Sequence, residues 1–218
     1  MDKIITLDQA VDKVKDGMTI MIGGFLGCGN PHRLIDALVE KDVKNLTLIC
    51  NDSSFPDMGV GKLIVKKCVK KLIASHVGTN PETGRQMNSG EMEVILVPQG
   101  TLAEQVRAGG AGLGGFLTPT GVGTVAEEGK QKITIDERVY LLELPLRADI
   151  ALIAGETVDQ FGNVVYHGAT RNFNHLMATA ADLVIIETEK IVEIGDLDPN
   201  SVVTPGIFID HIVNGGGN

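Results

Sequence analysis

The sequence predicts an α/β fold built on an open, mostly parallel sheet covered by helices. Short apolar runs bounded by glycines alternate with amphipathic segments that carry helix-start signals, and the connections between them are short. Strands that are apolar throughout are typical of parallel sheets buried on both faces. Of the 218 residues, 43% are hydrophobic and 22% charged, which is enough for a sizeable core. We expect one domain over residues 1–218.

The elements follow one another in a regular order. A capping box at Thr6 predicts a helix over residues 6–15, and Asn30 and Pro31 predict the cap and first turn of the next helix. A second capping box at Thr101 predicts a helix over residues 101–108. Further helices are predicted over residues 58–69 and 174–181, and strands over residues 18–22, 46–50, 72–76, 94–97, 139–144, 149–154 and 183–187.

One long stretch, residues 108–126, has no charged side chain. It contains seven glycines and a proline, which disfavour a helix in lipid or in water, so we expect a soluble glycine-rich loop.

The charge balance argues against several kinds of partner. The chain has 19 Lys and Arg against 28 Asp and Glu, a net charge of −9, which repels nucleic acid phosphates and anionic membrane surfaces. Charges precede any apolar stretch at the N-terminus, so no secretory signal is expected. The three cysteines have no Cys-x-x-Cys spacing, which fits a reducing cytoplasm. No His or Cys spacing suits a metal, and no metal site is expected.

Three segments follow predicted strands, where ligands bind in open α/β sheets. Residues 23–31 offer backbone N–H groups at a helix start, able to hold a phosphate or an oxyanion, although their glycines could equally serve a tight turn. Asn51 and Gln99 supply neutral amides that can bind a carboxylate or thioester oxygen; turn formation and solvation are the alternatives. Cys28 is either a nucleophile with a lowered pKa or a plain loop residue.

Three ordered motifs resemble the α subunits of family I coenzyme A transferases. The first is Gly23-Gly24-Phe25-x-x-x-Gly29-x-Pro31, and the others lie within residues 98–124 and 198–206. Together they extend over nearly the whole chain, which is most similar to the α subunits of the acetate, butyrate and acetoacetate enzymes. The resemblance implies the coenzyme A transferase (NagB-like) fold.

The resemblance also implies a reaction. Coenzyme A passes between short-chain acids in a ping-pong reaction through a glutamyl-CoA thioester, and the nucleophilic glutamate belongs to the β subunit. No catalytic residue is therefore expected on this chain, and neither Glu127 nor Glu193 inherits the role. The expected partners are a β subunit, in an α2β2 assembly that is inactive without it, an acyl-CoA and a short-chain carboxylate. No cofactor is expected, because coenzyme A enters as a substrate.

Carried over residue by residue, the resemblance assigns two sets of binding residues. Coenzyme A binding falls to Gly24, Phe25, Leu26, Gly27, Cys28, Gly29 and Asn30, and substrate binding to Asn51, Gln99 and Gly100. The alternative is a sugar-phosphate isomerase or a ligand-sensing domain of the same fold, in which a phosphate would meet the glycine loop. An isomerase needs a base near this loop, and His32 is the one candidate.

Overall fold

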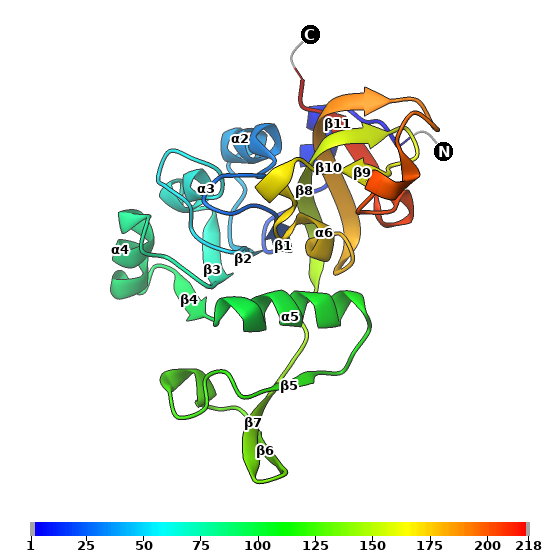
Figure 1. Ribbon diagram of the computed structural model, residues 1–218. Helices are drawn as coiled ribbons and strands as arrows, with labels where there is room; N and C mark the ends of the chain where they lie inside the picture. Colours follow the sequence, from blue (N-terminus) through cyan, green and yellow to red (C-terminus); the bar gives the residue numbers. More distant parts are fainter. Residues whose placement is uncertain (1–2, 217–218) are drawn as a thin grey trace.

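The computed structural model describes residues 3–216 and contains two sheets of unequal size (Figure 1). The larger has eight strands, in the order β11-β10-β8-β1-β2-β3-β4, with β9 paired to the side of β8. Every neighbouring pair along this order is parallel, and β9 is antiparallel to β8. The predicted open, mostly parallel α/β sheet is therefore confirmed.

The strands of the larger sheet are β1 (Thr19–Ile22), β2 (Leu46–Ile49), β3 (Val69–Ala74), β4 (Glu93–Leu96), β8 (Ala148–Asp159), β9 (Val164–Val165), β10 (Ala181–Val192) and β11 (His211–Asn214). The helices are α1 (Leu7–Val11), α2 (His32–Lys41), α3 (Gly61–Val65), α4 (Pro81–Ser89), α5 (Gln99–Gly110) and α6 (Asn174–Met177).

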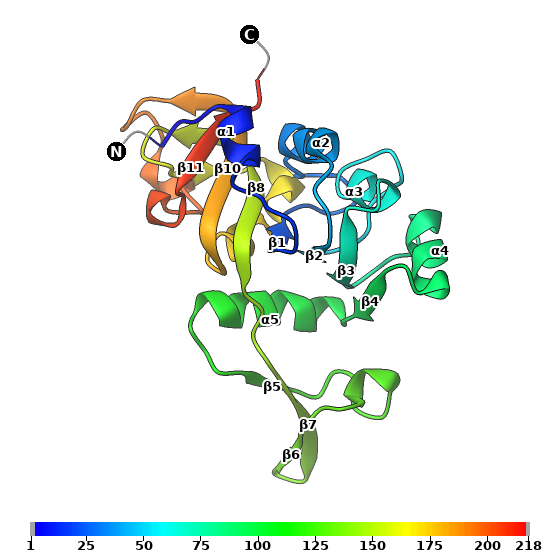
Figure 2. The ribbon, with the colours of Figure 1, turned by 180° about the vertical axis from the view of Figure 1, so that it is seen from behind.

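The larger sheet is buried on both faces because successive strand residues point to opposite sides. On β1, Ile20 and Ile22 belong to one apolar cluster, which also includes side chains of α1, α2 and α3. Met21, between them, belongs to a second cluster with side chains of α5 and α6. Figures 1 and 2 show the sheet from its two sides, with these helices around it.

Residues 112–146 form an arm that projects from the rest of the molecule below α5 (Figures 1 and 2). The arm contains the second sheet, in which β7 (Arg138–Glu143) pairs antiparallel with β5 (Phe116–Thr118) and β6 (Lys132–Ile135). The prediction of a loop over residues 108–126 is thus wrong in part, since α5 runs to Gly110 and β5 follows. The strand predicted over residues 139–144 exists, but it belongs to this second sheet.

The helix starts confirm one capping signal and correct two. Thr6 accepts a hydrogen bond from the backbone N–H of Gln9, whose side chain accepts one from Thr6 in return, as predicted. Asn30 does not cap α2, because Pro31 occupies the cap position and the Asn30 amide donates to the carbonyl of Gly23. Thr101 lies inside α5, which begins two residues earlier, at Gln99.

Candidate functional site

A pocket of about 350 Å³ lies at the carboxyl ends of β1, β2, β3 and β4. We call it the amide pocket; its lining residues are Phe25, Leu26, Asn51, Asp52, Ser75, His76 and Gln99. Parallel strands end at the same edge of a sheet, so segments distant in sequence meet there. The pocket brings together Phe25, Leu26, Asn51 and Gln99, four of the residues that the sequence analysis assigned to coenzyme A or substrate binding.

A short chain of hydrogen bonds orders the two amides of the pocket. The Gln99 Nε2 group donates to Asn51 Oδ1 at 2.7 Å, and Asn51 Nδ2 donates to Asp52 Oδ2, also at 2.7 Å. The Ser75 hydroxyl lies 2.7 Å from the Asn51 carbonyl oxygen and 3.3 Å from Asn51 Oδ1. Asn51 is 1% exposed, whereas Gln99 is open to solvent. The buried amide therefore holds the exposed one in place at the mouth of the pocket.

The glycine loop, residues 23–30, is closed by hydrogen bonds of its own. Phe25 and Cys28 exchange two backbone hydrogen bonds of 2.9 Å each, which makes a tight turn. The N–H of Gly24 donates to Asn172 Oδ1, and that of Leu26 to Asp52 Oδ2, each at 3.0 Å. Most of the backbone donors of this loop are thus engaged within the protein.

The start of α2 is also occupied. The carboxylate of Glu187, on β10, accepts hydrogen bonds from the backbone N–H groups of Arg33 at 3.2 Å and Leu34 at 2.8 Å. We expected this helix start to be open to a phosphate or an oxyanion, and that expectation is wrong because a side chain of the protein fills the position. Burial raises the pKa of Glu187, and these hydrogen bonds oppose the rise.

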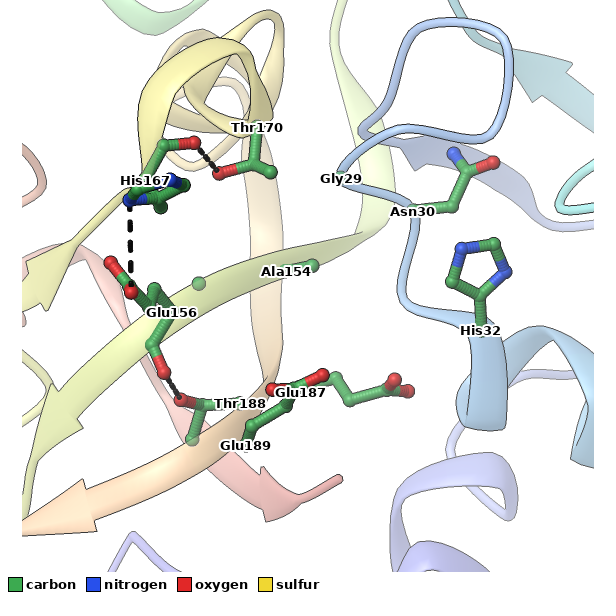
Figure 3. Close-up of a pocket in the computed structure, with 11 residues that line it drawn as sticks. Gly29, Asn30, His32, Ala154, Glu156, His167, Thr170, Glu187, Thr188 and Glu189 are labelled. Carbon is green, nitrogen blue, oxygen red and sulfur yellow. Dashed lines mark hydrogen bonds and ion pairs between the residues drawn. The ribbon is translucent and has the colours of Figure 1, made fainter. Parts of the chain in front are cut away.

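Figure 3 shows a second cavity, of about 330 Å³, with Asn30 and His32 among the residues that line it. Glu156, Glu187 and Glu189 from β8 and β10 line it. His167 Nδ1 lies 3.9 Å from Glu156 Oε1, a long contact between two half-exposed or exposed groups. Three carboxylates make this cavity unsuitable for the phosphates of coenzyme A, so the amide pocket is the better candidate site.

The remaining predicted residues lie around these two cavities. Gly29 and Asn30 line the cavity that contains the three glutamates, and Gly27 packs against the thioether of Met58. The side chain of Cys28 is exposed. Gly100 is exposed in the first turn of α5, outside the lining of the amide pocket.

Three lining residues of the amide pocket are not among the residues that the sequence analysis assigned to the site. Asp52 belongs to a candidate segment, residues 51–54, which follows a predicted strand, but only Asn51 of that segment was assigned. Ser75 and His76 were placed inside the strand predicted over residues 72–76, whereas β3 ends at Ala74. Because the end of this strand was predicted two residues too late, Ser75 and His76 were not recognised as side chains at the edge of the sheet.

Within residues 3–216, no group of three or more His, Cys, Asp or Glu side chains is placed to hold a metal ion. No helix in the same part of the chain is long and apolar enough to cross a membrane.

Comparison with known proteins identifies close relatives. The chain is 60% identical to the acetate CoA-transferase subunit alpha of Escherichia coli over 97% of its own length and 96% of that protein. It is 56% identical to the acetoacetyl-CoA:acetate/butyrate CoA transferase alpha subunit of Clostridium acetobutylicum, over 97% of each chain.

Solved structures share the fold. The acyl-CoA transferase YdiF of Escherichia coli O157:H7, in its thioester complex with CoA, matches with a TM-score of 0.88 at 23% identity. The match covers 98% of this chain and 47% of YdiF, so this chain spans about half the length of that protein. Glutaconate coenzyme A-transferase from Acidaminococcus fermentans matches with a TM-score of 0.84 at 20% identity, over 98% of this chain and 76% of that one.

These comparisons favour a coenzyme A transferase over a sugar-phosphate isomerase or a ligand-sensing domain of the same fold. Residues 4–215 match the protein family described as Coenzyme A transferase. With both the fold and the sequence in agreement over almost the whole chain, this protein belongs to the coenzyme A transferase family.

Proposed function

We propose that this chain is the α subunit of an enzyme that transfers coenzyme A between short-chain carboxylates, with acetate, butyrate and acetoacetate as its acids. The observation that carries the proposal is the amide pocket, where two neutral amides lie beside the exposed ring of Phe25 at the edge of the sheet. The names of the relatives from Escherichia coli and Clostridium acetobutylicum support the same acids.

In this proposal the reaction proceeds in two halves. A glutamate carboxylate of the β subunit attacks the carbonyl carbon of the acyl-CoA, and the coenzyme A thiolate leaves as an acyl-glutamyl anhydride forms. The thiolate then attacks the glutamyl carbonyl, which releases the acid and leaves a glutamyl-CoA thioester. The acceptor acid reverses these steps and carries coenzyme A away.

This chain would contribute hydrogen bonds and shape to that reaction. Gln99 would donate to an acyl oxygen as negative charge develops on it, an effect worth about 3 kcal/mol of the barrier for a well-placed donor. Neutral amides also leave the partner's glutamate ionised and free to attack, whereas an arginine would pair with it. Among residues 3–216, no Lys or Arg lines the amide pocket, which favours acids with a single carboxylate.

A β subunit is part of the proposal. Both relatives are named as alpha subunits, and the chain corresponds to about half of the longer YdiF protein. We infer an α2β2 assembly, located in the cytoplasm, that acts on its two substrates without a further cofactor.

The test compares this chain alone, the β chain alone and the two mixed, with butyryl-CoA or acetoacetyl-CoA as donor and acetate as acceptor. We expect transfer only in the mixture, and mass spectrometry should find the coenzyme A adduct on a glutamate of the β chain. Transfer by this chain alone, or an adduct on it, would overturn the proposal. The nucleophile would then have to be sought on this chain, with Glu127, Glu193 and Cys28 as the candidates.

A further inference from the structure

We propose that Asp52 is a positioning residue that sets the direction of the hydrogen bonds in the amide pocket. The inference rests on the proposed function, in which Asn51 and Gln99 face the acyl group. It adds Asp52, a residue that the family resemblance did not assign to the site. It also explains why the amides of Asn51 and Gln99 keep one orientation, with the same donor and acceptor atoms facing a ligand.

The Asp52 carboxylate is buried and fully engaged. It is 4% exposed, and three N–H groups surround it. Oδ2 accepts from Asn51 Nδ2 at 2.7 Å and from the backbone N–H of Leu26 at 3.0 Å, while Oδ1 accepts from the backbone N–H of Ser54 at 2.7 Å. Hydrogen bonds to a charged acceptor are stronger than those between neutral groups, so this arrangement is well defined.

An ionised carboxylate can only accept, and that property fixes both amides in turn. Asn51 must point its NH2 group at Asp52, which leaves Asn51 Oδ1 facing Gln99. Gln99 must then point its NH2 group at this oxygen, 2.7 Å away. One N–H and the oxygen of the Gln99 side chain remain for a ligand. Without the carboxylate, the side-chain amide groups of Asn51 and Gln99 could both rotate so that each exchanges the positions of its NH2 group and its oxygen. The hydrogen bond between them would then be kept with its direction reversed.

Asp52 also connects the pocket to the glycine loop. Its bond to the N–H of Leu26 holds the loop after β1 against the loop after β2, and Phe25 lines the pocket from the same turn. A group that fixes donors before the substrate arrives lowers the reorganisation needed during the reaction. We therefore expect its removal to lower kcat more than it raises KM.

The test is a double-mutant cycle on the complete α and β enzyme. Asp52→Ala and Asn51→Ala should each lower kcat by about tenfold or more, with KM for the acyl-CoA changed less. If Asp52 acts through Asn51, the double variant should be no more than about threefold slower than Asn51→Ala alone. Losses that multiply in the double variant would overturn the inference.

Two further variants keep the test decisive if Asp52→Ala folds poorly. Asp52→Asn retains one oxygen for Asn51 and Leu26 and should recover part of the lost kcat. Asp57→Asn removes a charge from an exposed side chain of the same loop and should leave kcat and KM unchanged. No recovery in Asp52→Asn would contradict the inference, because this variant keeps an oxygen that can accept from Asn51 and Leu26.

NMR spectroscopy of the side-chain NH2 groups tests the orientation of the two amides directly. In the full α chain, the side-chain NH2 groups of Asn51 and Gln99 should each give one pair of resonances, and those of the buried Asn51 should be protected from exchange. Asp52→Ala should broaden or double both pairs. Unchanged resonances would overturn the inference. If Asn51→Ala left kcat intact, the assignment of the pocket in the proposed function would fail as well, whereas a harmless Asp52→Ala beside a damaging Asn51→Ala would remove only the role of Asp52.

Discussion

Two opposing effects act on the carboxylate of Glu187. The N–H groups of Arg33 and Leu34 at the start of α2 favour its charged form, but removal from water is the larger effect and raises its pKa above 4.5. The folded protein therefore binds the proton of Glu187 more tightly than the unfolded chain does. The stability that Glu187 contributes is complete below pH 4.5 and is lost as the pH rises through the higher folded value.

Glu187→Gln tests this balance, because glutamine keeps one acceptor oxygen and cannot become charged. We expect the free energy of unfolding of the variant, relative to the wild type, to increase between pH 4 and pH 7. Urea unfolding of both proteins across this range measures the difference. Glu189→Gln, at an exposed neighbour, should show no such trend. A relative stability that falls as the pH rises would mean that helix capping outweighs desolvation.

At the scale of single residues, the sequence predicted which segments meet at the site but not how their polar atoms pair. Asn51 and Gln99 could be found because each follows a strand. The partner of Gly24, Asn172, lies 148 residues further along the chain, and Glu187 lies 153 residues from Leu34. No local pattern reports such distant partners, so the closure of the glycine loop and the filled start of α2 could not be foreseen.

At the scale of elements, two helical glycines should respond in opposite ways to alanine. A Cβ on Gly109 of α5 would collide with the backbone carbonyl of Leu146, where the arm returns to the larger sheet, whereas Gly84 of α4 has open space. Gly109→Ala should therefore destabilise the protein by about 1–3 kcal/mol. Gly84→Ala should stabilise it by about 0.5–1 kcal/mol, because alanine favours a helix. Urea unfolding of both variants measures the difference, and changes of equal sign would contradict this account.

The elements that sequence reasoning found are those with apolar periodicity. Strands β1 and β2 are apolar runs that were predicted to within a residue at each end. Strands β8 and β10 were found by their apolar first halves, but both continue for five polar or mixed residues beyond the predicted ends. Helix α4 was missed because its segment has one large apolar side chain, Met87, which is exposed. Its start signal was nevertheless present, since Asn80 accepts a hydrogen bond from the N–H of Glu82 and Pro81 follows it. The arm was missed because glycines dominate the stretch that leads into it.

At the scale of the whole molecule, a hydrogen bond to a buried carboxylate links the arm to helix α5. Glu143 of β7 is 2% exposed and accepts a hydrogen bond of 3.0 Å from Gln105 of α5. Lys130, in the arm, forms an ion pair of 2.6 Å with the same carboxylate. Because Gln99 begins α5, the helix that holds the arm also carries a residue of the amide pocket. The hydrogen bond from Gln105 thus connects the arm to this helix, and Lys130, which lies in the arm itself, neutralises the carboxylate that accepts this bond.

Lys130→Met removes the cation and leaves the buried carboxylate of Glu143 without its counter-charge. Breaking a buried pair from one side typically costs about 3–5 kcal/mol, so we expect a loss of this order in urea unfolding. Lys132→Met, which breaks the exposed pair with Glu127, should cost less than about 1 kcal/mol. The combination of Lys130→Met with Glu143→Gln should regain much of the loss, because no unpaired charge then remains and Gln105 keeps a partner. Equal losses for the two lysine variants would show that the stability of the protein does not depend on Lys130 as the counter-charge of Glu143.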